Sequence, residues 1–431
     1  MGVGSTVRAL RAANIWALLV AAVLVLGFVV WQQRDSNTSP TPAASDSSAA
    51  PPGNDGSDAS LLESTTDRLE RAWRSRNRDA FVSAAGTTPA AQSWGAQTYD
   101  SLNELGVKRI DFETRDGDFA DMQVVPDGTS DVRVEVSWVP GASSGLPVRR
   151  TEPVEVLFDV RLIEQGLAIE STQPLSDPMP IWLEGALNVL RRDSSTIVRI
   201  NGGSEEPKLE ERLTRALAAA RDVYGKPRRR PFVVLPSDDS ESADVTGMDP
   251  SRLSELAATT SSLDGSVSSK APIAVVLNPD VFTAMNPRAA QIVLSHETTH
   301  AITGAVTAVA PLWVTEGYAD YVAMVDDRLS PTRSASQILA RVRKNGPPRS
   351  LPSDDAFSST GARLGAAYEG AWMVFRMLGE TYDDATISRF YSRVLNGRAV
   401  EVAASNVFGV GIDDITEDWR AYLRDWATAP H

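Results

Sequence analysis

The chain has 431 residues and a formal net charge of −14, from 42 basic and 56 acidic side chains. Such an acidic balance, with no basic stripe along the sequence, argues against a nucleic-acid partner. The sequence contains no cysteine, which excludes disulfides and thiolate metal sites. Its 42% hydrophobic residues provide for buried cores, and the length accommodates two domains.

An apolar stretch near the N-terminus predicts a membrane anchor. It runs from Ala12 to Trp31, with Asn14 as its one polar residue, and about 20 apolar residues suffice to cross a bilayer as a helix. Arg8 and Arg11 precede it, so the positive-inside rule places the N-terminus in the cytoplasm and the rest outside. A cleaved signal peptide is the alternative, but the run is long for one and no small-x-small site follows it directly.

A polar linker follows the predicted anchor. Residues 1–34 form a cytoplasmic stub with a transmembrane signal-anchor, and residues 35–60 consist almost wholly of Ser, Thr, Pro, Ala, Gly, Asn and Asp. Such a composition is typical of a flexible tether. The protein is therefore expected to be a single-pass protein of the cell membrane whose folded domains are extracytoplasmic.

Residues 61–178 have the pattern of a small α+β domain. Leu62, Leu69 and Trp73 have the spacing of an amphipathic helix, and a second helical stretch begins at Ala80. Two later segments alternate apolar with polar residues, as half-buried antiparallel strands do. The alternating residues are Val132, Val134, Val136 and Trp138, then Val154, Val156, Phe158, Val160 and Leu162. Helices followed by such a sheet resemble the NTF2-like fold, which implies a domain that binds ligands or partners or serves as a spacer.

Residues 179–431 predict a second domain with a small mixed sheet. Short apolar runs indicate strands at Thr196–Ile200, Phe232–Leu235 and Ile273–Leu277. Between the first two, leucines recur on one face of a helix at 209–224. The C-terminal half is predicted to be mostly helical, with aromatic residues at core-like spacings. These aromatic residues are Trp372, Phe375, Phe390, Tyr391, Trp419 and Tyr422.

The string His296-Glu297-Thr298-Thr299-His300 contains two of the chain's three histidines. On a helix, histidines four residues apart lie on one face, so both can bind a single Zn²⁺. Glu297 then lies near the open coordination position, where it can accept a proton from water. The alternative is a helix with two surface histidines. The preceding residues 289–295 form a strongly helical apolar segment, which favours the metal site.

A second helix is predicted after Pro311, and it carries two acids one turn apart, Glu316 and Asp320. A catalytic zinc uses three protein ligands and a water, and two histidines with one glutamate are a standard set. Glu316 is the candidate third ligand. Asp320 is the candidate acceptor for a ring N–H of a ligand histidine, which fixes the tautomer. The alternative is a solvated acidic face, but Trp313 and Val314 make an apolar setting where unpaired charge is costly.

These two helices resemble the gluzincin metallopeptidases, the superfamily of thermolysin and the zinc aminopeptidases. Residues 312–321 look like its peptidase MA-like branch, many members of which are bacterial and membrane-tethered. In that family a glutamate on the second helix completes the zinc site and an aspartate one turn later orients a histidine. Fifteen residues separate His300 from Glu316, a few fewer than in thermolysin-like relatives, which implies a shorter connection. The resemblance covers roughly 230–425, and its specific part is 296–321.

The resemblance implies a strand that binds substrate and a residue that stabilises the oxyanion. The strand before the metal helix is implied to pair with an extended peptide through its backbone. It comprises Ala274, Val275, Val276 and Leu277. Tyr368 is the candidate oxyanion donor, with a half-buried core tyrosine as the alternative, and Tyr318 and Tyr321 are weaker candidates. The Gly-x-Met-Glu-Asn signature by which zinc aminopeptidases hold a substrate N-terminus is absent, which favours an endopeptidase.

The sequence thus predicts an α+β protein with an N-terminal transmembrane helix, an NTF2-like domain and a zincin-like domain. The predicted activity is that of a membrane-anchored, extracytoplasmic metallopeptidase with Zn²⁺ as cofactor and a peptide or protein as substrate. One alternative is a surface-tethered binding or scaffold protein with a structural or vestigial zinc site. Another is a zinc hydrolase that acts on a non-protein bond. An open coordination position favours an enzyme, whereas a fourth protein ligand favours the scaffold.

Overall fold

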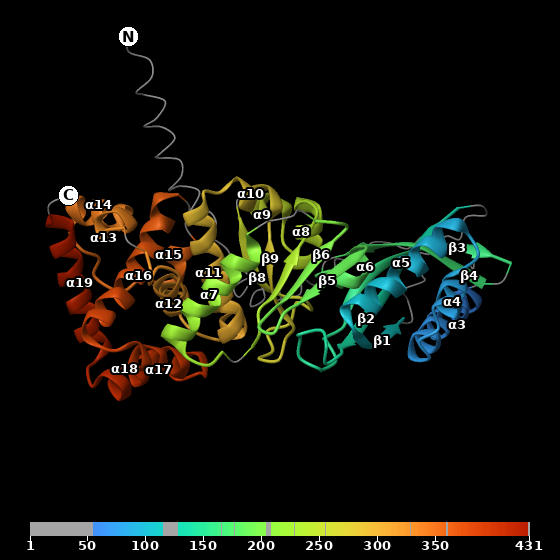
Figure 1. The fold of residues 1–431 in the computed structure, drawn as a ribbon, viewed down its shortest axis with the longest axis horizontal. Coiled ribbons are helices and arrows are strands. Elements are labelled where there is room, and N and C mark those ends of the chain that lie inside the picture. The colour runs from blue at the N-terminus through green and yellow to red at the C-terminus, as the bar shows by residue number, and fades with distance from the viewer. Residues whose placement is uncertain are drawn as a thin grey trace, which may run out of the picture.

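A computed structural model describes residues 55–429 except 115–127, 204–207, 359–360 and the single residues 165, 176, 228, 255 and 328. Within these residues the protein is α+β, with one four-stranded sheet and one five-stranded sheet (Figure 1). The N-terminal helices lie at one end of the molecule and the C-terminal helices at the other, with the five-stranded sheet between them (Figure 1).

No helix in the described part of the chain is long and apolar enough to cross a membrane. The two longest described helices, α3 (Asp55–Arg74) and α16 (Ala362–Thr381), have 20 residues each but carry charged residues along their length. The predicted spanning helix from Ala12 to Trp31 lies outside the described residues. The predicted fold class is therefore corrected to α+β, with no membrane-spanning helix among the residues that the structure describes. The location inferred from that helix, single-pass with extracytoplasmic domains, is not supported either.

The N-terminal unit packs three helices against an antiparallel sheet of order β1-β2-β3-β4. The predicted alternation in β2 and β3 is present, with Val134 opposite Val156, but Leu162 is 48% exposed near the end of β3. The NTF2-like resemblance of this unit stays a prediction, as do the boundaries predicted at 34, 60 and 178. Its elements are α3, α4 (Arg78–Ala85), α5 (Pro89–Leu105), β1 (Val107–Glu113), β2 (Ser130–Pro140), β3 (Val154–Ile163) and β4 (Gly166–Pro174).

The five-stranded sheet has the order β5-β6-β7-β9-β8. Strands β6, β7 and β9 are parallel, and the two outer strands, β5 and β8, run antiparallel to their neighbours. The bounds predicted for β6, β7 and β9 are confirmed, whereas β5 and β8 were not predicted. The strands are β5 (Leu187–Arg191), β6 (Thr196–Ile200), β7 (Phe232–Leu235), β8 (Ala258–Ser262) and β9 (Ile273–Leu277).

Both faces of this sheet are buried, which explains why its central strands are continuous apolar runs. On one face Val233 and Val275 pack into a core shared with α7 (Leu209–Tyr224) and α11 (Pro287–Thr303). On the other face Val234 and Val276 belong to the core of the N-terminal unit. The predicted boundary at residue 178 is therefore crossed by a continuous apolar core.

The C-terminal half is helical, as predicted, and several of its helices pack around α12 (Leu312–Ala323), which itself packs on α11. Helix α16 packs along α12, and both aromatic and aliphatic side chains fill the space between them. The remaining elements are α6 (Ile181–Glu184), α8 (Asp239–Thr246), α9 (Pro250–Leu253), α10 (Pro279–Ala284), η1 (Ala305–Thr307), α13 (Pro331–Ser334), α14 (Ser336–Asn345), α15 (Asp354–Phe357), α17 (Asp384–Leu395), α18 (Val400–Phe408) and α19 (Ile412–Thr428).

Candidate metal centre

Helix α11 carries the His-Glu-x-x-His string, and local signals fix both of its ends. The Asn286 side chain accepts hydrogen bonds from the first backbone N–H groups, and Pro287 occupies the first helical position. Gly304 ends the helix in the left-handed conformation at φ 75°, which a residue with a side chain adopts only under strain. The helix therefore presents His296 and His300, one turn apart, to the same side.

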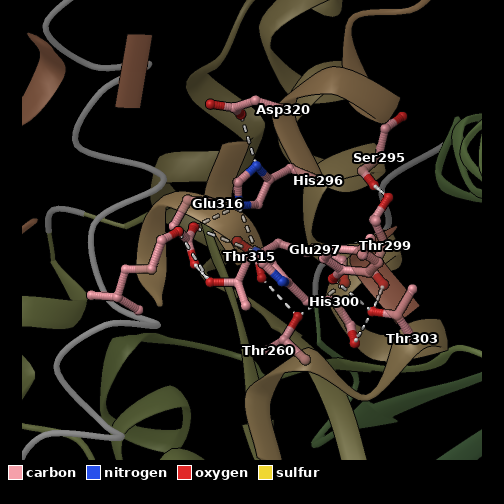
Figure 2. A network of polar contacts seen from close by, with 12 residues as sticks. Thr260, Ser295, His296, Glu297, Thr299, His300, Thr303, Thr315, Glu316 and Asp320 are labelled. Atoms are coloured by element: carbon pink, nitrogen blue, oxygen red, sulfur yellow. Dashed lines mark hydrogen bonds and ion pairs between the residues drawn. The ribbon is translucent and has the colours of Figure 1, made fainter. Parts of the chain in front are cut away.

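Three ligand atoms converge in the interior of the protein (Figure 2). The Nε2 atoms of His296 and His300 are 2.9 Å apart. Glu316 Oε2 lies 3.2 Å from the first and 3.5 Å from the second. Donor atoms about 2.0–2.1 Å from a tetrahedral zinc lie about 3.3 Å from one another, so this spacing suits such an ion.

The buried state of these groups also fits a metal ion. Both histidines and Glu316 are fully buried, and Glu316 Oε2 has no hydrogen-bond donor among the residues that the structure describes. An unpaired buried carboxylate oxygen is costly unless a cation or a donor meets it. Burial alone would raise the pKa of Glu316, but the two histidines outweigh it and lower that pKa to about 2. The carboxylate is thus held ionised, as a metal ligand requires.

Asp320 lies one turn after Glu316 on α12 and contacts the far side of the first histidine. Its Oδ1 is 2.8 Å from Nδ1 of His296 (Figure 2). Because the carboxylate oxygen accepts this hydrogen bond, Nδ1 carries a proton, and Nε2 is the ring nitrogen that faces the other ligand atoms. The structure therefore brings the four residues His296, His300, Glu316 and Asp320 together in the arrangement that the spacing of the two helices predicted.

Gly317 allows α12 to approach α16 closely. A Cβ atom at this position would lie 2.6 Å from the carbonyl oxygen of Ala371 and 2.9 Å from the ring of Phe375. Contacts that short do not occur between real atoms, so this position must be glycine at this helix separation. The close approach fixes Glu316 relative to α16, which carries Tyr368.

Tyr368 lies on α16, is 4% exposed, and packs its ring edge-on against Phe357 with centroids 5.0 Å apart. Burial raises the pKa of Tyr368 well above its usual value, and the carboxylates of Glu316, Asp320 and Glu297 raise it further. Helix α16, which carries this phenol, packs directly on α12, which carries Glu316 and Asp320. A phenol with a raised pKa keeps its proton at neutral pH and remains a hydrogen-bond donor.

The two weaker tyrosine candidates are engaged elsewhere. The Tyr318 hydroxyl lies 2.8 Å from Ser388 Oγ, and its ring stacks on Tyr391. The Tyr321 hydroxyl donates to Asp384 at 2.7 Å. Their phenol groups therefore stabilise the packing of α12 against α17.

Glu297 is 2% exposed and has a hydrogen-bond partner that the sequence pattern did not identify. The hydroxyl of Thr260 donates to Glu297 Oε2 at 2.7 Å (Figure 2). Burial raises the pKa of the Glu297 carboxyl, although the two histidines and this hydrogen bond oppose the rise. Thr260 lies 37 residues before Glu297 on β8, a strand without an apolar run, so no local motif marks it.

The predicted substrate strand is not at the edge of the sheet. Strand β9, which contains Ala274–Leu277, has β7 on one side and β8 on the other, so its backbone groups are already paired. The prediction that it binds an extended peptide is therefore wrong. The edge strand on this side is β8, which follows β7 in the chain but lies outside β9 in the sheet.

No protein-family model and no curated protein matches this sequence. Among solved structures, the chain is similar to an M1 zinc metallopeptidase from Deinococcus radiodurans, at 16% identity over 70% of this chain and 65% of that chain, with a TM-score of 0.34. The chain is also similar to a mutant M1 zinc metallopeptidase from the same organism bound to a Tyr-Ser-Ala substrate. The identity is 16% over 71% of this chain and 63% of that chain, with a TM-score of 0.33. A third similar structure is a two-domain M1 zinc metallopeptidase mutant bound to L-arginine. The identity is 14% over 63% of this chain and 59% of that chain, with a TM-score of 0.34. This chain spans less than two thirds of each of them.

Proposed function

We propose that this protein is a zinc-dependent metallopeptidase that hydrolyses peptide bonds. The observation that carries the proposal is the convergence of His296, His300 and Glu316 on one point, with Glu297 buried on the same helix. This is a donor set of catalytic zinc sites, which use three protein ligands and keep one position open. Among the described residues the metal-ligand group contains three members, which favours the enzyme over a scaffold with a closed structural site.

A zinc ion held here would lower the pKa of a bound water and polarise the substrate carbonyl. Glu297 is the general base in this proposal. Its carboxylate accepts the proton of the attacking water and then donates it to the leaving amine. Burial raises the pKa of the Glu297 carboxyl, which strengthens the carboxylate as a proton acceptor. Asp320 keeps His296 in the tautomer that binds metal.

Tyr368 is proposed to donate a hydrogen bond to the oxyanion that forms on the carbonyl oxygen. The raised pKa keeps its phenol protonated, and the helix that carries it packs directly on α12, which carries Glu316. A donor aimed at this oxygen strengthens as charge develops there, which lowers the barrier and not merely the substrate affinity.

The peptide is proposed to bind as an added strand along β8, whose five residues are buried in the structure, so its edge must open to admit the peptide. This strand is the sheet edge nearest the metal helix, and Thr260 on it contacts Glu297 directly. An extended peptide on that edge would place its backbone carbonyl near the centre. Because the signature that anchors a free substrate N-terminus is absent, an internal bond is the proposed point of cleavage.

The test compares the purified full chain with Glu297→Gln and His296→Ala. We expect one zinc per chain in the wild type and in Glu297→Gln, and no stoichiometric zinc in His296→Ala. Hydrolysis of a quenched-fluorescent peptide library by the zinc-loaded wild type should be lost in both variants. Hydrolysis by Glu297→Gln at the wild-type rate would refute the proposed base. Absence of zinc from the wild type after zinc is supplied would refute the metal site.

A further inference from the structure

Thr260 lies on the edge strand β8 with its side chain directed toward α11. It is 1% exposed, and its Oγ1 lies 2.7 Å from Glu297 Oε2 and 3.0 Å from the Glu297 backbone oxygen (Figure 2). The hydroxyl has a single proton, and hydrogen bonds to ionised acceptors are the stronger ones. The proton is therefore directed to the carboxylate.

We infer that Thr260 is a positioning residue that holds the Glu297 carboxylate in its catalytic rotamer, and this inference rests on the proposed function. Among the described residues, Thr260 is the one hydrogen-bond donor to that carboxylate. A Glu side chain has three rotatable bonds, so a carboxylate without such a donor would sample several positions. Anchoring Oε2 leaves Oε1 to accept the proton of the reacting water.

The packing around Thr260 does not itself require a hydroxyl. Residues on the same sheet face, Ala258, Val275 and Leu277, are apolar and belong to the core that α11 shares. Valine has the same shape as threonine and an equal preference for strands, and a buried hydroxyl costs free energy unless it is hydrogen-bonded. The hydrogen bond to Glu297 is therefore the interaction for which a threonine is needed at this position.

This contact also links the base to the proposed substrate edge. Thr260 belongs to β8, along which the peptide is proposed to pair, so the strand that aligns the substrate also aligns the base. Because the anchor acts on the base and not on the peptide, its loss should reduce kcat and leave KM nearly unchanged.

The test uses the zinc-loaded full chain and the variants Thr260→Val and Thr260→Ser. Thr260→Val removes the donor and keeps the shape, whereas Thr260→Ser keeps the donor. We expect Thr260→Val to lower kcat by about 10- to 100-fold, less than the roughly 100- to 10,000-fold that general acid–base catalysis contributes, because the base itself remains. KM should stay within about twofold, and Thr260→Ser should retain most of kcat. Thr246→Val is the matched control, because that buried hydroxyl bonds only to backbone oxygens of its own helix, α8.

Crystal structures of Thr260→Val and Thr260→Ser give a readout that does not depend on activity. We expect the Glu297 carboxylate to leave its position in Thr260→Val and to keep it in Thr260→Ser. An unmoved carboxylate in Thr260→Val, or a kcat within twofold of wild type, would overturn the inference. If the zinc-loaded wild type hydrolyses no peptide, the proposed function fails, and the carboxylate position in the two structures alone decides whether Thr260 positions Glu297.

Discussion

Replacement of Gly317 by alanine should damage the metal centre from outside it. The new Cβ would lie 2.6 Å from the Ala371 carbonyl oxygen, and ordinary contact begins at 3.4 Å. Helices α12 and α16 must therefore separate by about 0.8 Å at this point, the difference between 3.4 and 2.6 Å. Glu316 is the preceding residue and moves with its helix.

That displacement is large compared with what a zinc site tolerates. Metal–ligand distances hold to within about 0.2 Å, so a shift of about 0.8 Å removes Glu316 from the coordination sphere or strains it. We expect zinc affinity to fall at least about tenfold, which corresponds to about 1.4 kcal/mol. Overpacking should lower the free energy of unfolding by about 1–3 kcal/mol, and the higher helix propensity of alanine than of glycine should offset up to about 1 kcal/mol of this loss.

Gly370→Ala is the matched control on the partner helix. A Cβ there would meet its nearest neighbour, the Trp419 ring, at 3.4 Å, which is ordinary contact. Zinc affinity is measured by competition with a chromophoric chelator, and stability by thermal unfolding of the metal-free proteins. Gly317→Ala should lower both the zinc affinity and the unfolding temperature, whereas Gly370→Ala should lower neither of them. Equal zinc affinity in the two variants would refute the argument that helix separation positions Glu316.

Three further predictions concern single polar groups. Asp320→Asn removes the charge that orients His296 and should weaken zinc binding about 10- to 100-fold, measured by competition with a chelator. The control is Asp326→Asn, which changes an exposed aspartate, and an equal loss of zinc affinity in that variant would refute this role of Asp320. Tyr368→Phe should keep one zinc per chain and lower kcat about 100- to 1000-fold, so an unchanged kcat would exclude the phenol as oxyanion donor. Burial and acidic neighbours raise the pKa of Glu184 to about 8. The folded state therefore binds the Glu184 proton more tightly than the unfolded state does. Protonated Glu184 contributes fully to the free energy of unfolding below about pH 4.5, the pKa in the unfolded chain, and this contribution is lost as the pH rises through 8. Glu184→Gln should therefore unfold at a higher temperature than wild type at pH 9 but not at pH 4, and equal differences at both pH values would contradict the raised pKa.

The convergence of the residues at the candidate metal centre could be predicted because their signal is local. A spacing of four residues on a helix brings His296 to His300, and Glu316 to Asp320, whatever the rest of the chain does. The central strands could be predicted for a related reason. A strand buried on both faces, such as β9, must be apolar throughout, and so it appears as a run.

The position of each strand in the sheet could not be predicted in this way. Strand β8 has the sequence Ala-Thr-Thr-Ser-Ser, which contains no apolar run and no alternation, yet all five residues are buried. Its strand structure comes from pairing with β9 and packing on α11, which are contacts distant in the sequence. No signal in the sequence therefore identifies Thr260, and nothing in it shows that another strand lies outside β9.

The five-stranded sheet has a consequence for how this protein can be divided. One face is the floor beneath the metal helix, and Val198, Val234 and Val276 on the other face are sealed by the N-terminal unit. Cutting the chain near residue 178 would expose a large apolar surface on the half that holds the candidate metal site, and exposed apolar surfaces promote aggregation. The half that holds the candidate metal site therefore depends on the N-terminal unit to cover that face, and we expect it to need a replacement cover if it is expressed alone.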